Sequence, residues 1–235
     1  FESRKDCPVP RALDTSEIPT VIDEFRKAAR TAVEAGMDGV ELHGANGYLL
    51  HQFLSPNSNL REDAYGGSPE NRFRLIEEIL RAAADEIGAD RVGIRLSPQT
   101  NIQGIEETDP ADVLATYGGL LDATADLGLA YVSFIHADPA GELMTELIAR
   151  ARANGRTRII LNSGGAEGTQ RDRAEWLVQQ GDAVSVGRMA ISNPDLVRRW
   201  KEDLPVNAPD VSTFYTGGER GYTDYPFYPD SDRER

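Results

Sequence analysis

Residues 39–48, with the sequence GVELHGANGY, decide the fold class. The first half is a short run of alternating apolar and polar residues, which predicts a strand, and the two glycines of the second half predict a tight turn. Four more such runs follow, and each of the five comes after a segment with helical spacing of its apolar residues. This order is typical of βαβ units, so the sequence predicts an α/β fold with a parallel sheet. The predicted strands are 39–43, 92–96, 131–135, 158–162 and 183–186.

The helices are predicted from apolar spacing and from capping residues. Ser68-Pro69 and Asp109-Pro110 each combine an N-cap residue with a proline suited to the first helical position. Glycines that favour a left-handed C-terminal cap indicate where helices end. The expected ends are Gly36, Gly88 and Gly128, and shorter helices are expected at about 142–153, at about 170–180 and from Asn193-Pro194 through Trp200.

Composition excludes several classes of function. The 235 residues carry 25 Lys+Arg and 39 Asp+Glu, a net charge of −14, whereas nucleic-acid binding depends on clustered cations. Cys7 is the only cysteine, so we expect no intrachain disulfide and a cytoplasmic protein. No apolar run approaches the length of a membrane span, and we expect no membrane partner. His51 and His136 lack a third ligand at metal spacing, and we assign no metal.

The strongest candidate site follows the first predicted strand. His43, Asn46 and Tyr48 are separated by Gly44 and Gly47, which allow a tight turn, so the three side chains can converge. Imidazole and carboxamide can donate hydrogen bonds to a carbonyl or nitro oxygen, and a phenol, with an ordinary pKa of about 10, can deliver a proton. A capped loop with a buried polar histidine is the alternative interpretation.

Two further features lie at the ends of later predicted strands. Arg95 ends the second strand, where a buried guanidinium needs an anionic partner, and an ion pair with Glu41 is one alternative. A pair of glycines follows the fourth strand, and a glycine and an arginine follow the fifth. In barrels, backbone N–H groups of such loops commonly bind phosphate. These residues are Gly164, Gly165, Gly187 and Arg188.

Several of these motifs together resemble one known family. Residues 39–54, GVELHGANGYLLHQFL, are similar to the signature of the old yellow enzyme family of flavin-dependent ene-reductases. The resemblance covers the chain from about Pro10, with the motifs in the same order as in that family. The other similar stretches are REDAYGGSPENRFR (61–74), GIRLSP (93–98), NSGG (162–165), VGR (186–188) and TFYTGGERGYTDYP (213–226).

The resemblance implies a (β/α)₈ barrel that binds FMN non-covalently and uses NAD(P)H to reduce the activated C=C bonds of α,β-unsaturated carbonyl or nitro compounds. By position, His43 and Asn46 match the pair that binds the substrate oxygen, and Tyr48 matches the proton donor. Arg95 matches a residue that binds the flavin, whose extra charge on reduction collects around N1 and O2.

The remaining cofactor contacts are implied in the same way. The glycines and Arg188 after the last two strands would hold the FMN phosphate. Phe214 and Tyr215 match an aromatic pair that folds over the flavin edge and the substrate pocket, so we expect Phe214 at the cofactor and Tyr215 at the substrate.

The chain departs from the family pattern at its N-terminal side. The five predicted strands match the fourth to eighth strands of the barrel, so residues 1–235 are expected to form a single partial barrel domain with an aromatic-rich tail at 205–235. Strands four to eight alone would leave two open sheet edges. We therefore expect either a second polypeptide that carries strands 1–3 or a cleavage ahead of Cys7. A homo-oligomer is also compatible with the sequence.

Two other functions stay open. Another phosphate-binding barrel enzyme, such as an aldolase or isomerase, usually depends on a lysine or paired carboxylates at strand ends, whereas these strand ends carry His, Arg and Gly. A non-catalytic half-barrel that serves only in assembly is the second alternative.

Overall fold

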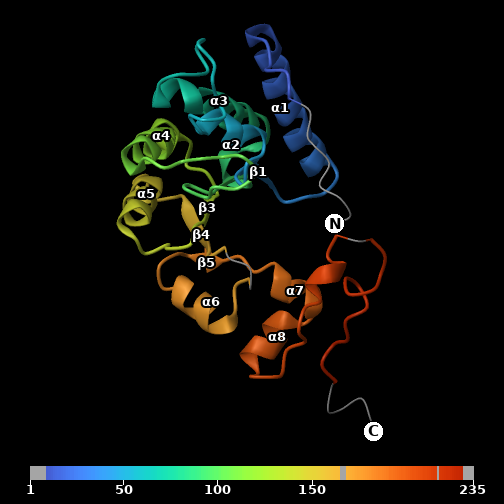
Figure 1. The fold of residues 1–235 in the computed structure, drawn as a ribbon. Coiled ribbons are helices and arrows are strands. Elements are labelled where there is room, and N and C mark those ends of the chain that lie inside the picture. The colour runs from blue at the N-terminus through green and yellow to red at the C-terminus, as the bar shows by residue number, and fades with distance from the viewer. Residues whose placement is uncertain (1–8, 165–167, 216, 230–235) are drawn as a thin grey trace.

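The computed structural model describes residues 9–164, 168–215 and 217–229, and these contain one five-stranded sheet. The strands lie in chain order and every neighbouring pair is parallel, as Figure 1 shows. The predicted α/β class is therefore confirmed. The strands are β1 (Val40–Gly44), β2 (Val92–Leu96), β3 (Tyr131–Ile135), β4 (Arg158–Asn162) and β5 (Ala183–Val184).

Helices connect these strands, and α3, α4 and α5 form a stack beside the sheet in Figure 1. Helix α3 packs against α1 and α4, and α4 packs against α5. The α-helices are α1 (Ile18–Glu34), α2 (Leu49–Leu54), α3 (Pro69–Ile87), α4 (Pro110–Ala123), α5 (Glu142–Arg152), α6 (Arg171–Leu177), α7 (Arg188–Ser192) and α8 (Leu196–Lys201). Short 3₁₀ helices are η1 (Thr15–Glu17), η2 (Ala89–Arg91), η3 (Ala125–Leu127) and η4 (Val211–Thr213). Within the described ranges, no helix combines the length and the apolar character needed to cross a membrane.

The predicted N-terminal caps are confirmed. The Ser68 hydroxyl accepts the backbone N–H of Asn71 at 3.3 Å, and the Asp109 carboxylate accepts that of Ala111 at 2.9 Å. Each proline follows its cap directly, where the missing N–H breaks no helical bond.

Three boundaries differ from the prediction by two or three residues. Strand β5 ends at Val184, and only the Ser185 N–H extends its pairing, to the Leu161 carbonyl at 3.0 Å. Helix α6 ends at Leu177 and a turn follows. Helix α8 begins at Leu196 rather than beside Asn193, because the Asn193 amide binds the Met189 carbonyl at 2.9 Å instead of capping a helix. Helix α2 was not predicted at all.

The two faces of the sheet differ in chemistry. Successive side chains alternate between the faces, and the strand register aligns equivalent positions on neighbouring strands. One face is apolar and joins the helices in a single core, while the other carries polar groups near the C-terminal ends of the strands. The buried apolar strand residues are Leu42, Ile94, Leu96, Val132, Phe134, Ile159 and Leu161.

Arg72 of α3 joins three segments behind the site. Its side chain is nearly fully buried, at 3% exposure for the residue. The Nε atom donates to the carbonyl oxygen of Leu54 at the end of α2, at 2.8 Å. The Nη2 atom contacts the Asp112 carboxylate at 2.6 Å and the Thr116 hydroxyl at 2.8 Å, both on α4.

Replacing Arg72 with methionine should destabilise the protein strongly. Arg72→Met deprives the Leu54 carbonyl and the buried side of Asp112 of their donor, and we expect the free energy of unfolding to fall by about 3–5 kcal/mol. Urea denaturation measures the change. Arg171→Met removes exposed ion pairs to Glu175 and Asp203 and should leave the urea midpoint nearly unchanged. A urea midpoint for Arg72→Met equal to that of Arg171→Met contradicts the stabilising role of the buried Arg72 contacts.

Candidate active site

Three polar side chains occupy one row on the open face of the sheet. The register pairs His43 of β1 with Arg95 of β2, and Arg95 with Ser133 of β3, so the three residues share one face. We call His43, Arg95 and Ser133 the polar row. It lies toward the C-terminal ends of the strands, where parallel α/β folds place their sites. Ser133 was missed by sequence reasoning, although the two-residue alternation along its strand could have found it.

Two atoms of the polar row lack partners. Within the described residues, the buried Nε of Arg95 and Oγ of Ser133 have no hydrogen-bond partner. Arg95 reaches the Glu41 carboxylate only at 4.0 Å, so the ion pair considered as an alternative is present but long. Buried polar atoms are normally paired, so a donor and a hydroxyl left unpaired on the same face indicate a binding site for a polar ligand.

Tyr48 lies beside His43, at the β1 end of the polar row. Strand β1 positions His43, and Tyr48 is the N-cap residue of α2. Their ring centroids lie 5.2 Å apart at an angle of 57°. Tyr48 is 53% exposed, so its hydroxyl is accessible to a small molecule. The predicted proximity of these two side chains is therefore observed.

A short turn between the two rings carries Asn46. We call residues 45–48 the site loop. Asn46 has a φ of 57° and Gly47 a φ of 79°, both in the left-handed region that favours glycine. A Cβ at Gly47 would lie 2.7 Å from the Cβ of Gln103, so the site loop also packs closely against the loop after β2. The Asn46 N–H donates to the Ser97 hydroxyl at 2.8 Å.

The surroundings of His43 favour its neutral form. Burial lowers the pKa of His43 below its ordinary 6.5, and the positive charge of Arg95 lowers it further, while Glu41 acts in the opposite direction. The neutral imidazole of His43 is therefore favoured down to a lower pH than in an ordinary histidine. At neutral pH one ring nitrogen carries a proton and can donate a hydrogen bond.

The glycine-rich loops after β4 and β5 lie against each other. Gly168 has a φ of 71°, and a Cβ there would lie 3.2 Å from the Cβ of Arg188. Gly187 directly precedes α7, and a Cβ on it would meet nothing within 4 Å. The Gly164 N–H, however, donates to the Asn162 side chain at 2.8 Å. Gly165, also predicted for this site, lies outside the described residues.

Phe214 and Tyr215 lie in the C-terminal tail, directly after η4. Their rings contact each other edge-on, 6.4 Å apart, and Tyr215 is 77% exposed. Figure 1 shows the tail beside α7 and α8, and Arg199 of α8 holds it there through the Pro226 carbonyl at 2.8 Å. Strand β1, which carries His43, and strand β5 are the two edges of the sheet.

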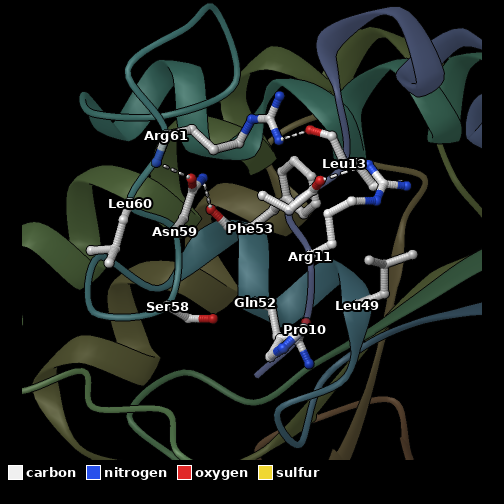
Figure 2. A pocket seen from close by; sticks show the side chains of 11 residues that line it. Pro10, Arg11, Leu13, Leu49, Gln52, Phe53, Ser58, Asn59, Leu60 and Arg61 are labelled. Carbon is white, nitrogen blue, oxygen red and sulfur yellow. Dashed lines mark hydrogen bonds between the residues drawn. The ribbon is translucent and has the colours of Figure 1, made fainter. Parts of the chain in front are cut away.

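A cavity of about 350 Å³ beside α2 does not include any of the predicted site residues (Figure 2). Its polar groups bind one another: the Asn59 amide donates to the Phe53 carbonyl at 2.8 Å, and the Arg61 guanidinium donates to the Leu13 carbonyl. It is lined by Pro10, Arg11, Ala12, Leu13, Leu49, Gln52, Phe53, Ser58, Asn59, Leu60 and Arg61.

The same fold occurs in solved structures of similar proteins. Morphinone reductase in complex with tetrahydroNAD is 39% identical with a TM-score of 0.83, and the match covers 96% of this chain and 60% of that protein. An old yellow enzyme homologue from Zymomonas mobilis is 34% identical with a TM-score of 0.83, covering 96% of this chain and 63% of that protein. The partial barrel and the resemblance to the old yellow enzyme family are thereby confirmed.

Plant proteins are similar over the same region. Putative 12-oxophytodienoate reductase 10 of Oryza sativa subsp. japonica is 42% identical over 237 residues, which cover 96% of this chain and 73% of the relative. 12-Oxophytodienoate reductase 1 of the same plant is 43% identical over 228 residues, or 96% and 60%. The chain thus spans about three fifths to three quarters of the length of these relatives. Residues 1–207 match the profile of the NADH:flavin oxidoreductase / NADH oxidase family, and the chain belongs to that family.

Proposed function

We propose that this protein contributes the substrate-binding half of an FMN-dependent reductase of activated C=C bonds, in α,β-unsaturated carbonyl or nitro compounds, with NAD(P)H as the hydride source. The observation that carries the proposal is the polar row with Tyr48 beside it, at the C-terminal end of a parallel sheet. The names of the relatives, 12-oxophytodienoate reductase and morphinone reductase, support the same reaction class.

The residues of the polar row fit a flavin. A guanidinium with an unpaired, buried Nε suits a planar ring whose edge becomes negative on reduction. The neighbouring loops with Gly187, Arg188 and Gly164 are proposed to hold the phosphate, with Gly165 as a further part of that cradle. When bound, FMN supplies the hydride transfer itself. Phe214 is proposed to cover the cofactor and Tyr215 to contact the substrate once the barrel is closed.

The protein's own groups stabilise charge and deliver a proton. His43 and Asn46 are proposed to donate hydrogen bonds to the substrate oxygen, on which negative charge develops as hydride reaches the β-carbon. A neutral His43 keeps an N–H for this purpose. Tyr48 is proposed to act as the general acid that protonates the α-carbon. Its exposed hydroxyl allows reprotonation from solvent.

The remaining strands of the barrel are proposed to come from a second polypeptide or a separate segment. Within the described residues, β1 pairs only with β2 and β5 only with β4, so each leaves one edge unpaired. Intact mass spectrometry with light scattering tests this proposal, and a single folded monomer of 25.8 kDa contradicts it. A homo-oligomer and a cytoplasmic location stay predictions.

Tyr48→Phe should separate the two halves of the reaction. Without the hydroxyl, reduction of bound flavin by NAD(P)H should be unchanged, because no proton from Tyr48 is needed. Reoxidation by 2-cyclohexenone should slow by about 10²–10⁴-fold, the usual contribution of general acid catalysis. Stopped-flow absorbance of the flavin measures both rates.

The control for this variant is Tyr222→Phe, which removes the hydroxyl of an exposed tail tyrosine. It should leave both rates unchanged. An unchanged rate of reoxidation in Tyr48→Phe contradicts the assignment of Tyr48 as the proton donor. A protein that stays colourless after FMN is added favours the non-catalytic half-barrel.

Arg95→Met should change two separate quantities. Loss of the cation destabilises the anionic reduced flavin, so the potential of bound FMN should fall by on the order of 30 mV. The same loss removes one cause of the lowered His43 pKa, so the titration midpoint of His43 should rise toward 6.5. Spectroelectrochemistry measures the potential, and NMR of the imidazole C–H protons measures the midpoint.

The matched control is Arg158→Met, which removes an exposed strand arginine that pairs with Asp182. It should alter neither quantity. A wild-type midpoint for His43 at or above 6.5 contradicts the electrostatic account of the site. An FMN potential unaffected by Arg95→Met contradicts the flavin contact.

A further inference from the structure

The site loop is held by buried side chains that the proposed reaction does not use. Two consecutive backbone N–H groups of the loop each have a side-chain acceptor. The Asn46 N–H donates to the Ser97 hydroxyl at 2.8 Å, and the Gly47 N–H donates to Nδ1 of His51 at 3.0 Å. Ser97 follows β2 and His51 belongs to α2, so the loop is held from two different elements.

These contacts fix the tautomer of His51. A backbone N–H can only donate, so Nδ1 of the fully buried imidazole carries a lone pair and the proton lies on Nε2. The Nε2–H points to Oε1 of Glu107, at 3.2 Å. The His51 imidazole therefore bridges the Glu107 carboxylate and the backbone of the site loop by two hydrogen bonds.

Glu107 is an acceptor with several donors. The residue is only 3% exposed. Its Oε1 also accepts the Tyr117 hydroxyl at 2.9 Å, and its Oε2 accepts the Gln99 N–H at 2.8 Å. Burial, together with the carboxylate, raises the pKa of Tyr117 well above its ordinary value, so Tyr117 stays a neutral donor.

A buried carboxylate is a costly way to fill space, because its desolvation must be offset by several hydrogen bonds. The Glu107 carboxylate joins three segments by hydrogen bonds: the connection after β1 through His51, the loop after β2 through Gln99, and α4 through Tyr117. The site loop needs such support because Asn46 is a non-glycine residue at positive φ, a conformation whose energetic cost must be offset by the surrounding contacts.

We propose that His51 is a positioning residue, which fixes the site loop through the bond from the Gly47 N–H to its Nδ1 and so orients Asn46 and Tyr48 toward the substrate. The inference rests on the proposed function for those two side chains. A purely structural role would instead make His51 matter for folding alone.

Two substitutions of His51 test the contacts of the two ring nitrogens separately. In His51→Asn the side-chain oxygen can take the place of Nδ1 and accept the Gly47 N–H, whereas the contact with Glu107 is lost. In His51→Gln the amide can reach Glu107 but leaves Gly47 without an acceptor at the Nδ1 position. Both variants bury one amide, so their effects on folding should be similar.

The first measurement compares the two half-reactions in the FMN-loaded protein. Reduction by NADH or NADPH should be unchanged in both variants. Reoxidation by 2-cyclohexenone should be about 10- to 100-fold slower in His51→Gln, because a displaced proton donor loses rate steeply, and should stay within a few-fold of wild type in His51→Asn. Thr124→Val, which removes a buried hydroxyl bound to the Leu120 carbonyl in α4, is the stability control.

The second measurement does not depend on catalysis. Amide hydrogen exchange of Gly47, followed by NMR, should be slow in wild type and His51→Asn and fast in His51→Gln. Equal reoxidation rates in the two His51 variants overturn the positioning role. The same conclusion follows if the reoxidation rates of the His51 variants fall only in proportion to the loss of thermal midpoint, as calibrated with Thr124→Val. A rapidly exchanging Gly47 amide in wild type overturns the network itself. A wild-type protein that never turns over an enone, with the Gly47 pattern intact, overturns the proposed function and the catalytic purpose of His51 with it.

Discussion

The parallel register of β1, β2 and β3 is the constraint on which the site depends. Because His43, Arg95 and Ser133 are aligned by backbone pairing, their side chains must leave the sheet on the same face. A shift of one residue in any strand would turn a polar group into the apolar core and a core residue out of it. The same alternation that builds the hydrophobic core therefore gathers the polar residues opposite it.

The site loop adds a second level of order to this row. Sheet pairing positions His43, but Asn46 and Tyr48 lie beyond the strand, where no ladder fixes them. Their positions depend on side chains from α2 and from the loop after β2, chiefly His51 and Glu107. Rigid strands and a hydrogen-bonded loop thus combine to place donors before any ligand arrives, as electrostatic stabilisation of a developing charge requires.

The sequence was most informative where the signal is local. Strand runs, Ser68 and Asp109 caps, and the turn at Gly47 follow from neighbouring residues, and all were predicted. The role of His51 could not be, because its partner Glu107 is 56 residues away and is placed only by the tertiary fold. The alternation along the strand could have assigned Ser133 to the face opposite the core, but only the register sets it beside Arg95.

The tail shows a different limit. Phe214 and Tyr215 match a family motif, but motif matching does not give the distance to His43, which depends on how the edges β1 and β5 come together. Helix α2 was missed because six residues give too little periodicity to recognise. For the tail the missing information is tertiary, whereas for α2 the local signal itself is too short.

A crystal structure of the protein with FMN bound tests the central claim most directly. The account predicts that the flavin ring lies on the polar row, with its pyrimidine edge on the Arg95 guanidinium, its phosphate between the loops after β4 and β5, and Tyr48 facing the ring. A structure in which FMN lies elsewhere, for example in the cavity beside α2, while Arg95 and Ser133 keep their unpaired atoms, would contradict it.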